Sequence, residues 1–234
     1  MKKTLLITGA SKGIGLATAE RFARDGYDVM NLSRSAPPLA EIRHLPFDLG
    51  AKEWPEADIH EIKDFCAGSD RLVLIHNAAK LESDSVMNVD AQALRDTLEL
   101  NVVAVSRLNQ LLIGEMEMGS SILYVGSTLG EKAVANACSY VVSKHALIGL
   151  MRATCQDLLG TGIHTACICP GFTDTAMLRS HVGQDEDVLT GIASGVTFNR
   201  LIEPEEIAEA LHFCAASPVI NGSVIHANLG QIER

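Results

Sequence analysis

The sequence lacks several features that would each assign the protein to a class. It has no apolar run of about 18 residues, the length that a membrane-spanning helix needs. Its six cysteines and eight histidines form no C-x-x-C pair and no H-E-x-x-H cluster, so reduced cysteines and no metal site are expected. A formal net charge of −10 argues against nucleic acid as a general partner. The apolar stretch after Lys3 is too short for a signal peptide, and we expect a cytoplasmic protein with no membrane contact.

The first 25 residues carry the strongest local pattern. An apolar run over residues 4–8 leads into a glycine-rich turn and then into helical periodicity; the turn reads Gly9-Ala10-Ser11-Lys12-Gly13-Ile14-Gly15. Glycines permit positive φ, close approach of a phosphate to bare backbone and close packing of the helix on the strand. The helix begins with unpaired N–H groups and a positive dipole end, which favour an anion such as a pyrophosphate. Alone, the turn is equally consistent with an ordinary strand-turn-helix joint.

The rest of the chain alternates apolar runs with helical periodicity. Strands are expected at residues 27–33, 44–47, 71–76, 121–125, 163–169 and 223–227, and helices at 59–67, 90–116, 139–159 and 203–216. Asp90 is the expected N-cap of its helix. Residues 174–198 show no sustained period. This order predicts an α/β protein with a single domain over residues 1–234, built on a doubly wound parallel sheet that binds ligands at the carboxyl ends of its strands.

Several motifs occur in the order and spacing of the short-chain dehydrogenase/reductase family, which the sequence resembles over nearly its whole length. They are Thr8-Gly9-Ala10-Ser11-Lys12-Gly13-Ile14-Gly15, Asp48-Leu49, Asn77-Ala78-Ala79, Asn101-Val102, Ser127, Tyr140-x-x-x-Lys144, Pro170-Gly171 and Asn221-Gly222. The resemblance implies a Rossmann fold of about seven parallel strands with a nicotinamide cofactor. Two residues depart from the family pattern: Ala79 stands where glycine is usual, and Thr173 replaces a usual aliphatic residue.

Tyr140 and Lys144 are four residues apart, so on a helix both side chains point from one face. A free phenol titrates near pH ~10, and a nearby ammonium favours the phenolate, which brings the tyrosine toward useful acid-base chemistry. Taken alone, the pair is more simply explained as a half-exposed aromatic beside a surface lysine. The presence of Ser127 favours a catalytic interpretation of the pair. Ser127 follows the end of a buried strand, and its hydroxyl is suited to hold a substrate carbonyl or alkoxide.

The resemblance implies further roles. Lys144 would also bind the nicotinamide ribose, and Asn101 would hold a water that relays protons to it; the alternative for Asn101 is a helix-bending side chain bonded to its own backbone. Asp48 resembles the carboxylate that accepts a bond from the adenine amine, or it caps a turn. Asn77 either bonds across to a neighbouring strand or occupies an ordinary turn, and Thr175 either contacts the cofactor or caps a helix. The expected cofactor-binding residues are Gly9, Ser11, Lys12, Gly13, Ile14, Gly15, Ser33, Arg34, Asp48, Asn77, Tyr140, Lys144, Pro170, Gly171, Thr173 and Thr175.

The end of the second strand predicts which cofactor is preferred. NAD-selective sites of this type usually carry an acid there, which bonds the ribose 2′-hydroxyl and repels a 2′-phosphate. Here the position is Ser33, followed by Arg34, whose guanidinium can grip a phosphate with two charge-assisted bonds. Lys12 would add a second positive charge. We therefore expect NADP(H), with NAD(H) as the alternative if Arg34 and Lys12 are ordinary surface residues.

These residues together predict an NAD(P)-dependent oxidoreductase that interconverts a carbonyl compound and a secondary alcohol, with Tyr140 as general acid/base. The alternatives are a cofactor-binding regulator or scaffold without turnover, and an isomerase or lyase that uses the same site. A protein that only binds has no need for the complete set of Ser127, Tyr140, Lys144 and Asn101.

The parts of the chain least fixed by pattern are expected to form the substrate pocket. Its walls are expected from Thr128, Leu129, Val134, Asn136 and a mobile lid at residues 174–198, and their mix of small and apolar groups favours a modest uncharged carbonyl compound. The helices at 90–116 and 139–159 carry more apolar residues than one sheet face covers. A homodimer or homotetramer is therefore expected.

Overall fold

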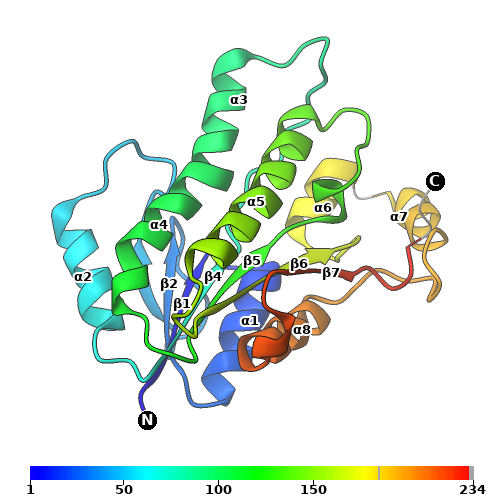
Figure 1. Cartoon of the computed structure of the whole chain (residues 1–234). Coiled ribbons are helices and arrows are strands. Elements are labelled where there is room, and N and C mark those ends of the chain that lie inside the picture. The colour runs from blue at the N-terminus through cyan, green and yellow to red at the C-terminus, as the bar shows by residue number, and fades with distance from the viewer. Residues whose placement is uncertain (184, 232–234) are drawn as a thin grey trace.

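In the computed structural model, which describes residues 1–183 and 185–231, seven strands form one parallel sheet in the order β3-β2-β1-β4-β5-β6-β7 (Figure 1). The strands are β1 (Lys3–Thr8), β2 (Asp28–Ser33), β3 (Arg43–Pro46), β4 (Arg71–His76), β5 (Ser121–Val125), β6 (His164–Pro170) and β7 (Ser223–Ala227). Each lies within two residues of its predicted position. The predicted doubly wound parallel sheet is confirmed.

Strand β1 lies at the point where the strand order reverses. It pairs with β2 on one side and with β4 on the other, with Ile7 opposite both Asn31 and Ile75. The chain therefore leaves β1 in one direction and returns to the opposite side of it at β4. Connections that diverge in this way open a crevice beyond the carboxyl ends of the two strands, which is where open α/β sheets bind ligands.

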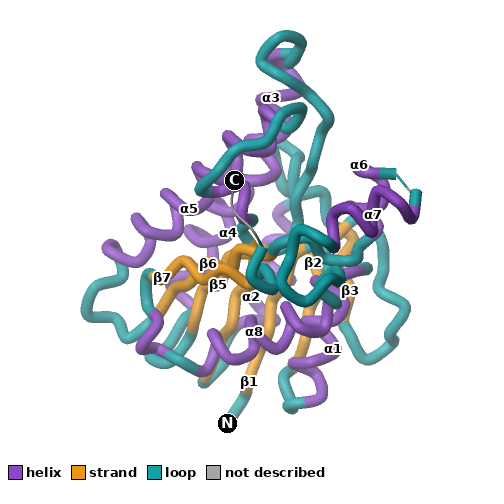
Figure 2. Tube along the Cα trace, turned by 90° about the vertical axis from the view of Figure 1, so that its right-hand side faces the viewer, coloured by secondary structure: helices purple, strands orange, loops and turns teal. Residues whose placement is uncertain are grey.

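Helices cover both faces of this sheet. They are α1 (Gly13–Arg24), α2 (Glu56–Cys66), α3 (Ala91–Leu98), α4 (Ala104–Leu112), α5 (Cys138–Asp157), α6 (Ala176–Val182), α7 (Glu186–Ala193) and α8 (Pro204–Ala216). In Figures 1 and 2, α4 and α5 lie over one face, whereas α1 and α8 lie together over the other. Within the described part of the chain, no helix is both long enough and apolar enough to cross a membrane.

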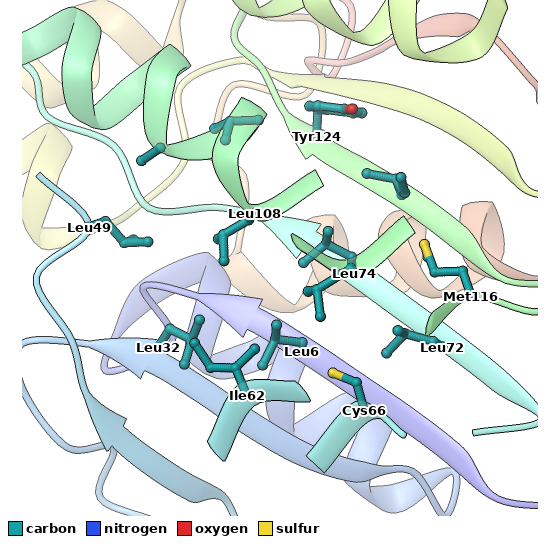
Figure 3. Packing of buried hydrophobic residues seen from close by; sticks show 14 of the residues in the cluster. Leu6, Leu32, Leu49, Ile62, Cys66, Leu72, Leu74, Leu108, Met116 and Tyr124 are labelled. Atoms are coloured by element: carbon teal, nitrogen blue, oxygen red, sulfur yellow. The ribbon is translucent and has the colours of Figure 1, made fainter. Parts of the chain in front are cut away.

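Each face of the sheet has its own apolar core. Figure 3 shows one of them, in which strand residues pack against α2 and α4; the labelled side chains include Leu6, Leu32, Leu72, Leu74, Ile62, Cys66 and Leu108. On the other face, Phe22 of α1 and Leu211 of α8 are fully buried in a second cluster, which also contains strand residues such as Ile7 and Ile75. Because alternate residues of a strand point to opposite faces, the continuous apolar runs in the sequence supply both cores.

A chain of buried polar groups joins four elements within the first core. His76 Nε2 at the end of β4 lies 2.8 Å from Asn109 Oδ1 of α4, and Asn109 Nδ2 donates to the Tyr124 hydroxyl of β5 at 2.8 Å. That hydroxyl donates to Thr154 Oγ1 of α5 at 3.1 Å. Burial lowers the pKa of His76 to about 4 and raises the pKa of Tyr124 to about 12, so both groups are neutral at pH 7. The network ties α5 to the sheet.

Two expectations about helices need correction. Helix α2 begins three residues earlier than predicted, at Glu56, because Pro55 precedes it and acidic residues occupy its first turn. The predicted helix at 90–116 is divided into α3 and α4 by a π-helical turn over Glu99–Val103. Its N-cap is Asp90, as predicted, with Oδ1 accepting from two amides at 2.9 Å.

Residues 174–198 contain two short helices, although the sequence shows no sustained period there. Thr175 Oγ1 accepts from Leu178 N at 3.2 Å to cap α6, and Asp185 Oδ1 accepts from Asp187 N at 2.9 Å to cap α7. Helices of seven and eight residues are too short to establish an apolar period, and their first turns are fixed by side-chain caps instead.

Candidate active site

A cavity of about 950 Å³ lies at the carboxyl ends of the strands. It is lined by the glycine-rich turn, by the ends of β2, β4, β5 and β6, and by parts of α5 and α6. All sixteen residues expected to bind the cofactor line it, and so does Ser127. Of the residues expected to act in catalysis or to bind the cofactor, Asn101 alone does not line the cavity. Tertiary structure therefore brings together motifs that are up to about 165 residues apart.

The turn after β1 requires its glycines. Gly9 and Gly13 have φ of 72° and 57°, a region that side chains with a Cβ rarely adopt. A Cβ on Gly15 would lie 2.5 Å from Asn77 Nδ2, and a Cβ on Gly9 would lie 2.9 Å from Ala78 Cα. Asn77 Nδ2 donates to the carbonyls of Thr8 and Gly9 at 3.0 and 2.9 Å, so the end of β4 is bonded across to β1.

The first turn of α1 is suited to an anion. Its N-cap residue, Lys12, makes no side-chain capping bond, and the first turn contains no acidic residue. Backbone N–H groups and the positive end of the helix dipole thus face the cavity without a competing carboxylate. The site holds a glycine cradle, a helix N-terminus and a cavity of suitable size, and it therefore fits a pyrophosphate-containing dinucleotide.

Asn31 is a positioning residue that the sequence reasoning missed. It is fully buried in β2, where its Oδ1 accepts from Ala10 N at 2.8 Å and its Nδ2 donates to Ser33 Oγ at 2.8 Å. It thereby links the glycine-rich turn to the position expected to select the cofactor. The sequence did contain a signal for this role, because Asn31 stands between apolar residues in the middle of the strand. A polar side chain buried there needs hydrogen-bond partners, and these are often in a neighbouring segment.

Tyr140 and Lys144 lie on the face of α5 that lines the cavity. Lys144 is only 2% exposed, and its Nζ donates to the Val125 carbonyl at 2.8 Å. The same Nζ lies 5.4 Å from the centre of the Tyr140 ring. A surface lysine beside a half-exposed aromatic is therefore the wrong interpretation of this pair. Val125 directly precedes Gly126 and Ser127, so the lysine is anchored at the strand end that also carries the serine.

Ser127 is held at the end of β5 by its own turn and by close packing on β6. Its Oγ accepts from Leu129 N at 3.1 Å, which leaves the hydroxyl proton available to a ligand oxygen. A Cβ on the preceding Gly126 would lie 2.6 and 2.8 Å from the sulfurs of Cys167 and Cys169. Only glycine lets the backbone at this point approach β6 so closely, and this approach sets the position of Ser127.

Asn101 lies in the π-helical turn and bonds to the backbone of Lys80, which lines the cavity. Its Oδ1 accepts from Lys80 N at 2.8 Å, and its Nδ2 donates to Lys80 O at 3.0 Å and to Ser143 Oγ at 2.9 Å. The side chain is thus not bonded to its own helix, which was the alternative considered above. Isolated π-turns often occur at functional sites. Here the turn directs Asn101 toward α5 and toward the segment that follows β4.

Several residues expected to contact the cofactor also have local structural bonds. Asp48 Oδ1 accepts from Gly50 N at 3.0 Å in a turn, Thr173 Oγ1 donates to Gly171 O at 3.2 Å, and Thr175 caps α6. The turn-capping and helix-capping alternatives thus describe real bonds of Asp48 and Thr175. These residues also line the cavity. Their local bonds would therefore hold the side-chain oxygens in position before a cofactor binds.

The substrate end of the cavity differs in one residue from the expectation. Thr128, Leu129 and Val134 line it, together with residues of α6 and α7, but Asn136 does not. Asn136 has a φ of 60° and is exposed. A residue in this left-handed conformation directs the chain into α5, and asparagine tolerates the conformation better than most side chains do.

Comparison with known proteins agrees with this geometry. The chain is 28% identical over 240 residues to the 3-oxoacyl-(acyl-carrier-protein) reductase FabG of Vibrio harveyi, covering 97% of this chain and 96% of the relative. It is 28% identical over 235 residues to carbonyl reductase family member 4 of Xenopus tropicalis, with 96% of each chain covered. The ligand-free aldohexose dehydrogenase AldT of Thermoplasma acidophilum superposes with a TM-score of 0.90 at 28% identity, over 98% of this chain and 93% of that one. The family model for short chain dehydrogenases matches residues 3–186, and the protein belongs to that family.

Proposed function

We propose that this protein is an NADP(H)-preferring oxidoreductase that interconverts a small carbonyl compound and the corresponding secondary alcohol. Membership of the short chain dehydrogenase family supports a nicotinamide-dependent oxidoreductase. The observation that carries the proposal for this chain is the convergence of Ser127, Tyr140 and Lys144 on the cavity that also contains the glycine-rich turn. A scaffold without turnover has no physical need for a buried lysine beside the phenol. An isomerase or lyase at the same site is the remaining alternative.

In the proposed reaction the bound nicotinamide supplies or accepts the hydride. The Ser127 hydroxyl holds the substrate oxygen, and Tyr140 gives that oxygen its proton in reduction or removes it in oxidation. Lys144 places its positive charge beside Tyr140, where it stabilises negative charge that develops at the reacting oxygens during the reaction. The water-holding role expected of Asn101 stays a prediction.

The preference for NADP(H) rests on charge at the end of β2. Ser33 stands where an acid would repel a 2′-phosphate, while the exposed side chains of Arg34 and Lys12 line the same end of the cavity. Neither cation forms an ion pair with another residue in 1–183 or 185–231. A guanidinium and an ammonium in this position suit a phosphate dianion.

The substrate is proposed to be a modest uncharged carbonyl compound. Leu129 and Val134, with Met177, Leu178 and Ile192 of the two short helices, give the substrate end a largely apolar lining. The relatives are named for reduction of 3-oxoacyl groups and of carbonyl compounds, and the similar structure is named for aldohexose oxidation. A first panel should therefore contain a 3-oxoacyl thioester, a diketone, simple ketones and aldehydes, and an aldohexose.

The test follows the absorbance of the reduced nicotinamide with this panel, for wild type and for Tyr140→Phe. We expect turnover of at least one carbonyl substrate, and a loss of about two to four orders of magnitude in the variant, which is the usual scale for a positioned acid-base group. Cofactor binding should persist. Tyr27→Phe removes a hydroxyl outside the cavity and serves as the control, with unchanged turnover. Activity of Tyr140→Phe close to that of wild type would contradict the mechanism.

We also propose that the protein forms a homodimer or homotetramer through α4 and α5. Val142 of α5 and Val103, which directly precedes α4, are 44% and 41% exposed in the isolated chain. An apolar helix face of this kind is commonly covered by a second copy across a two-fold axis. Sedimentation at micromolar concentration should give at least a dimer, and a monomer would contradict the proposal.

A further inference from the structure

Helix α5, which carries Tyr140 and Lys144, does not cap its own N-terminus. The residue at the N-cap position is Ala137, which makes no side-chain capping bond. The bonds come instead from Asp84, in the connection between β4 and α3. The Asp84 carbonyl accepts from Cys138 N at 3.1 Å, and its Oδ1 accepts from Ser139 N at 3.0 Å. Asp84 and Ala137 also form an isolated parallel bridge.

These two bonds fall immediately before Tyr140 in the chain. The first turn of a helix has N–H groups without intrahelical partners, and it frays unless something binds them. Here an oxygen acceptor and a carboxylate from a distant segment bind the amides of the two residues that precede Tyr140, and the carboxylate also suits the positive end of the helix. The two hydrogen bonds from Asp84 therefore fix the backbone position from which the Tyr140 side chain extends.

Asp84 belongs to a segment that contacts three parts of the site. At residues 80–84, the backbone of Lys80 bonds to the side chain of Asn101, as described above. Ser83 Oγ lies 3.2 Å from Nδ1 of His181, a residue of α6 that lines the cavity. Asp84 then binds α5. The segment is thus set from one side by Asn101 and from another by α6, and Asp84 transmits its position to the first turn of α5.

We propose that Asp84 is a positioning residue for the reaction proposed above: by holding the first turn of α5, it places the Tyr140 hydroxyl for proton transfer. The inference rests on the proposed function. A displacement of about 1 Å at a reacting group is enough to lower turnover up to a hundredfold. Lys144 is one turn further along α5 and has its own anchor on Val125, so cofactor binding depends little on Asp84.

The test compares three variants. Asp84→Ala removes the side-chain acceptor, and Asp84→Asn keeps an amide oxygen that can accept from Ser139 N. Asp90→Ala removes the same kind of cap from α3, since Asp90 Oδ1 also binds two first-turn amides, but that helix does not carry Tyr140. Each variant is measured for thermal stability, kcat, KM and the Kd of NADPH, and for hydrogen exchange of the amides at 138–141 without substrate.

For Asp84→Ala we expect kcat to fall about ten- to a hundredfold, with KM and the NADPH Kd within about twofold of wild type. Exchange at residues 138–141 should become roughly five- to tenfold faster. Asp84→Asn should recover most of kcat. Asp90→Ala should lower thermal stability with kcat unchanged. If Asp84→Ala does not fold, Asp84→Ser, whose hydroxyl is too short to reach the amide in the same backbone position, carries the same expectation.

Wild-type kcat in a folded Asp84→Ala or Asp84→Ser variant would overturn the inference, and so would an equal loss of kcat in Asp90→Ala. Unchanged exchange at 138–141 in the Asp84 variant would overturn it as well. Failure of the proposed function gives a different result. If wild type turns over none of the carbonyl substrates, the function is wrong, whereas the exchange measurement still decides whether Asp84 holds the first turn of α5.

Discussion

The Lys144 ammonium lies 5.4 Å from the centre of the Tyr140 ring and is held there by a 2.8 Å hydrogen bond to the Val125 carbonyl. The lysine is almost completely buried, so its charge acts on the phenol with little screening by solvent. The last residue of β5, two residues before Ser127, thus holds the lysine, and the lysine lies beside the tyrosine. Ser127, Lys144 and Tyr140 are thus placed relative to one another through the end of β5 and the first turns of α5.

Lys144→Ala should impair both cofactor affinity and turnover, because the lysine is assigned a role in each. The loss of a buried positive charge next to the phenol should reduce turnover roughly a hundredfold or more. Titration of NADPH and steady-state kinetics would measure the two effects separately. Lys52→Ala removes an exposed lysine away from the cavity and should change neither. A variant with normal turnover would show that the charge of Lys144 does not assist Tyr140.

Arg34→Ala should weaken the binding of NADPH and leave the binding of NADH almost unchanged, because only NADPH carries a 2′-phosphate. A charge-assisted contact contributes roughly 1.5 to 3 kcal/mol, so the Kd for NADPH should rise about ten- to a hundredfold. Fluorescence titrations with both cofactors would measure this. Arg24→Ala, an exposed arginine at the end of α1, is the matched control. An equal loss for the two cofactors would mean that Arg34 does not recognise the 2′-phosphate.

Residues 174–198 should close over the substrate as a mobile lid. Helices α6 and α7 are only seven and eight residues long and lie beyond the sheet, and short peripheral segments open at low free-energy cost. Amide exchange there should be fast in the free protein and slower with cofactor and substrate bound. Peptides from β5 should exchange slowly in both states. Equal protection of residues 174–198 with and without ligand would contradict a lid.

The free energy of unfolding should decrease as the pH falls from 6.5 toward 4. Burial lowers the pKa of His76 to about 4 in the folded protein, whereas an unfolded histidine titrates near pH ~6.5. Between pH 4 and 6.5 the unfolded chain binds more protons at this histidine than the folded protein does. The contribution of neutral, buried His76 to the free energy of unfolding is therefore complete above pH 6.5 and is lost as the pH falls. The loss should approach about 3 kcal/mol. Urea denaturation between pH 4.5 and 7 would measure it.

His76→Gln is the comparison variant, because its amide can donate to Asn109 without titrating. Its stability should depend less on pH over the same interval. Some dependence should remain, since burial also lowers the pKa of His164. Parallel curves for wild type and variant would show that His76 is not the group responsible.

Local patterns in the sequence were sufficient where a short segment determines its own structure. The glycine-rich turn was predictable because positive φ at Gly9 and Gly13 requires glycine. The spacing of Tyr140 and Lys144 placed both on one helix face, and continuous apolar runs identified strands buried on both sides. The helices at 174–198 were not predictable, because caps at Thr175 and Asp185 depend on single side chains rather than on a period.

The sequence by itself determined the order of strands and helices and the glycine turn, because these follow from periodicity and from conformational preferences within a few residues. The residues proposed for catalysis were indicated by their resemblance to family motifs. Only the tertiary structure decided how those parts are held. Asn31 binds the glycine turn from a neighbouring strand, Asn101 binds the segment after β4, and Asp84 caps a helix that begins more than fifty residues later. Such bonds join residues that are distant in the chain, and no local preference encodes which donor will meet which acceptor.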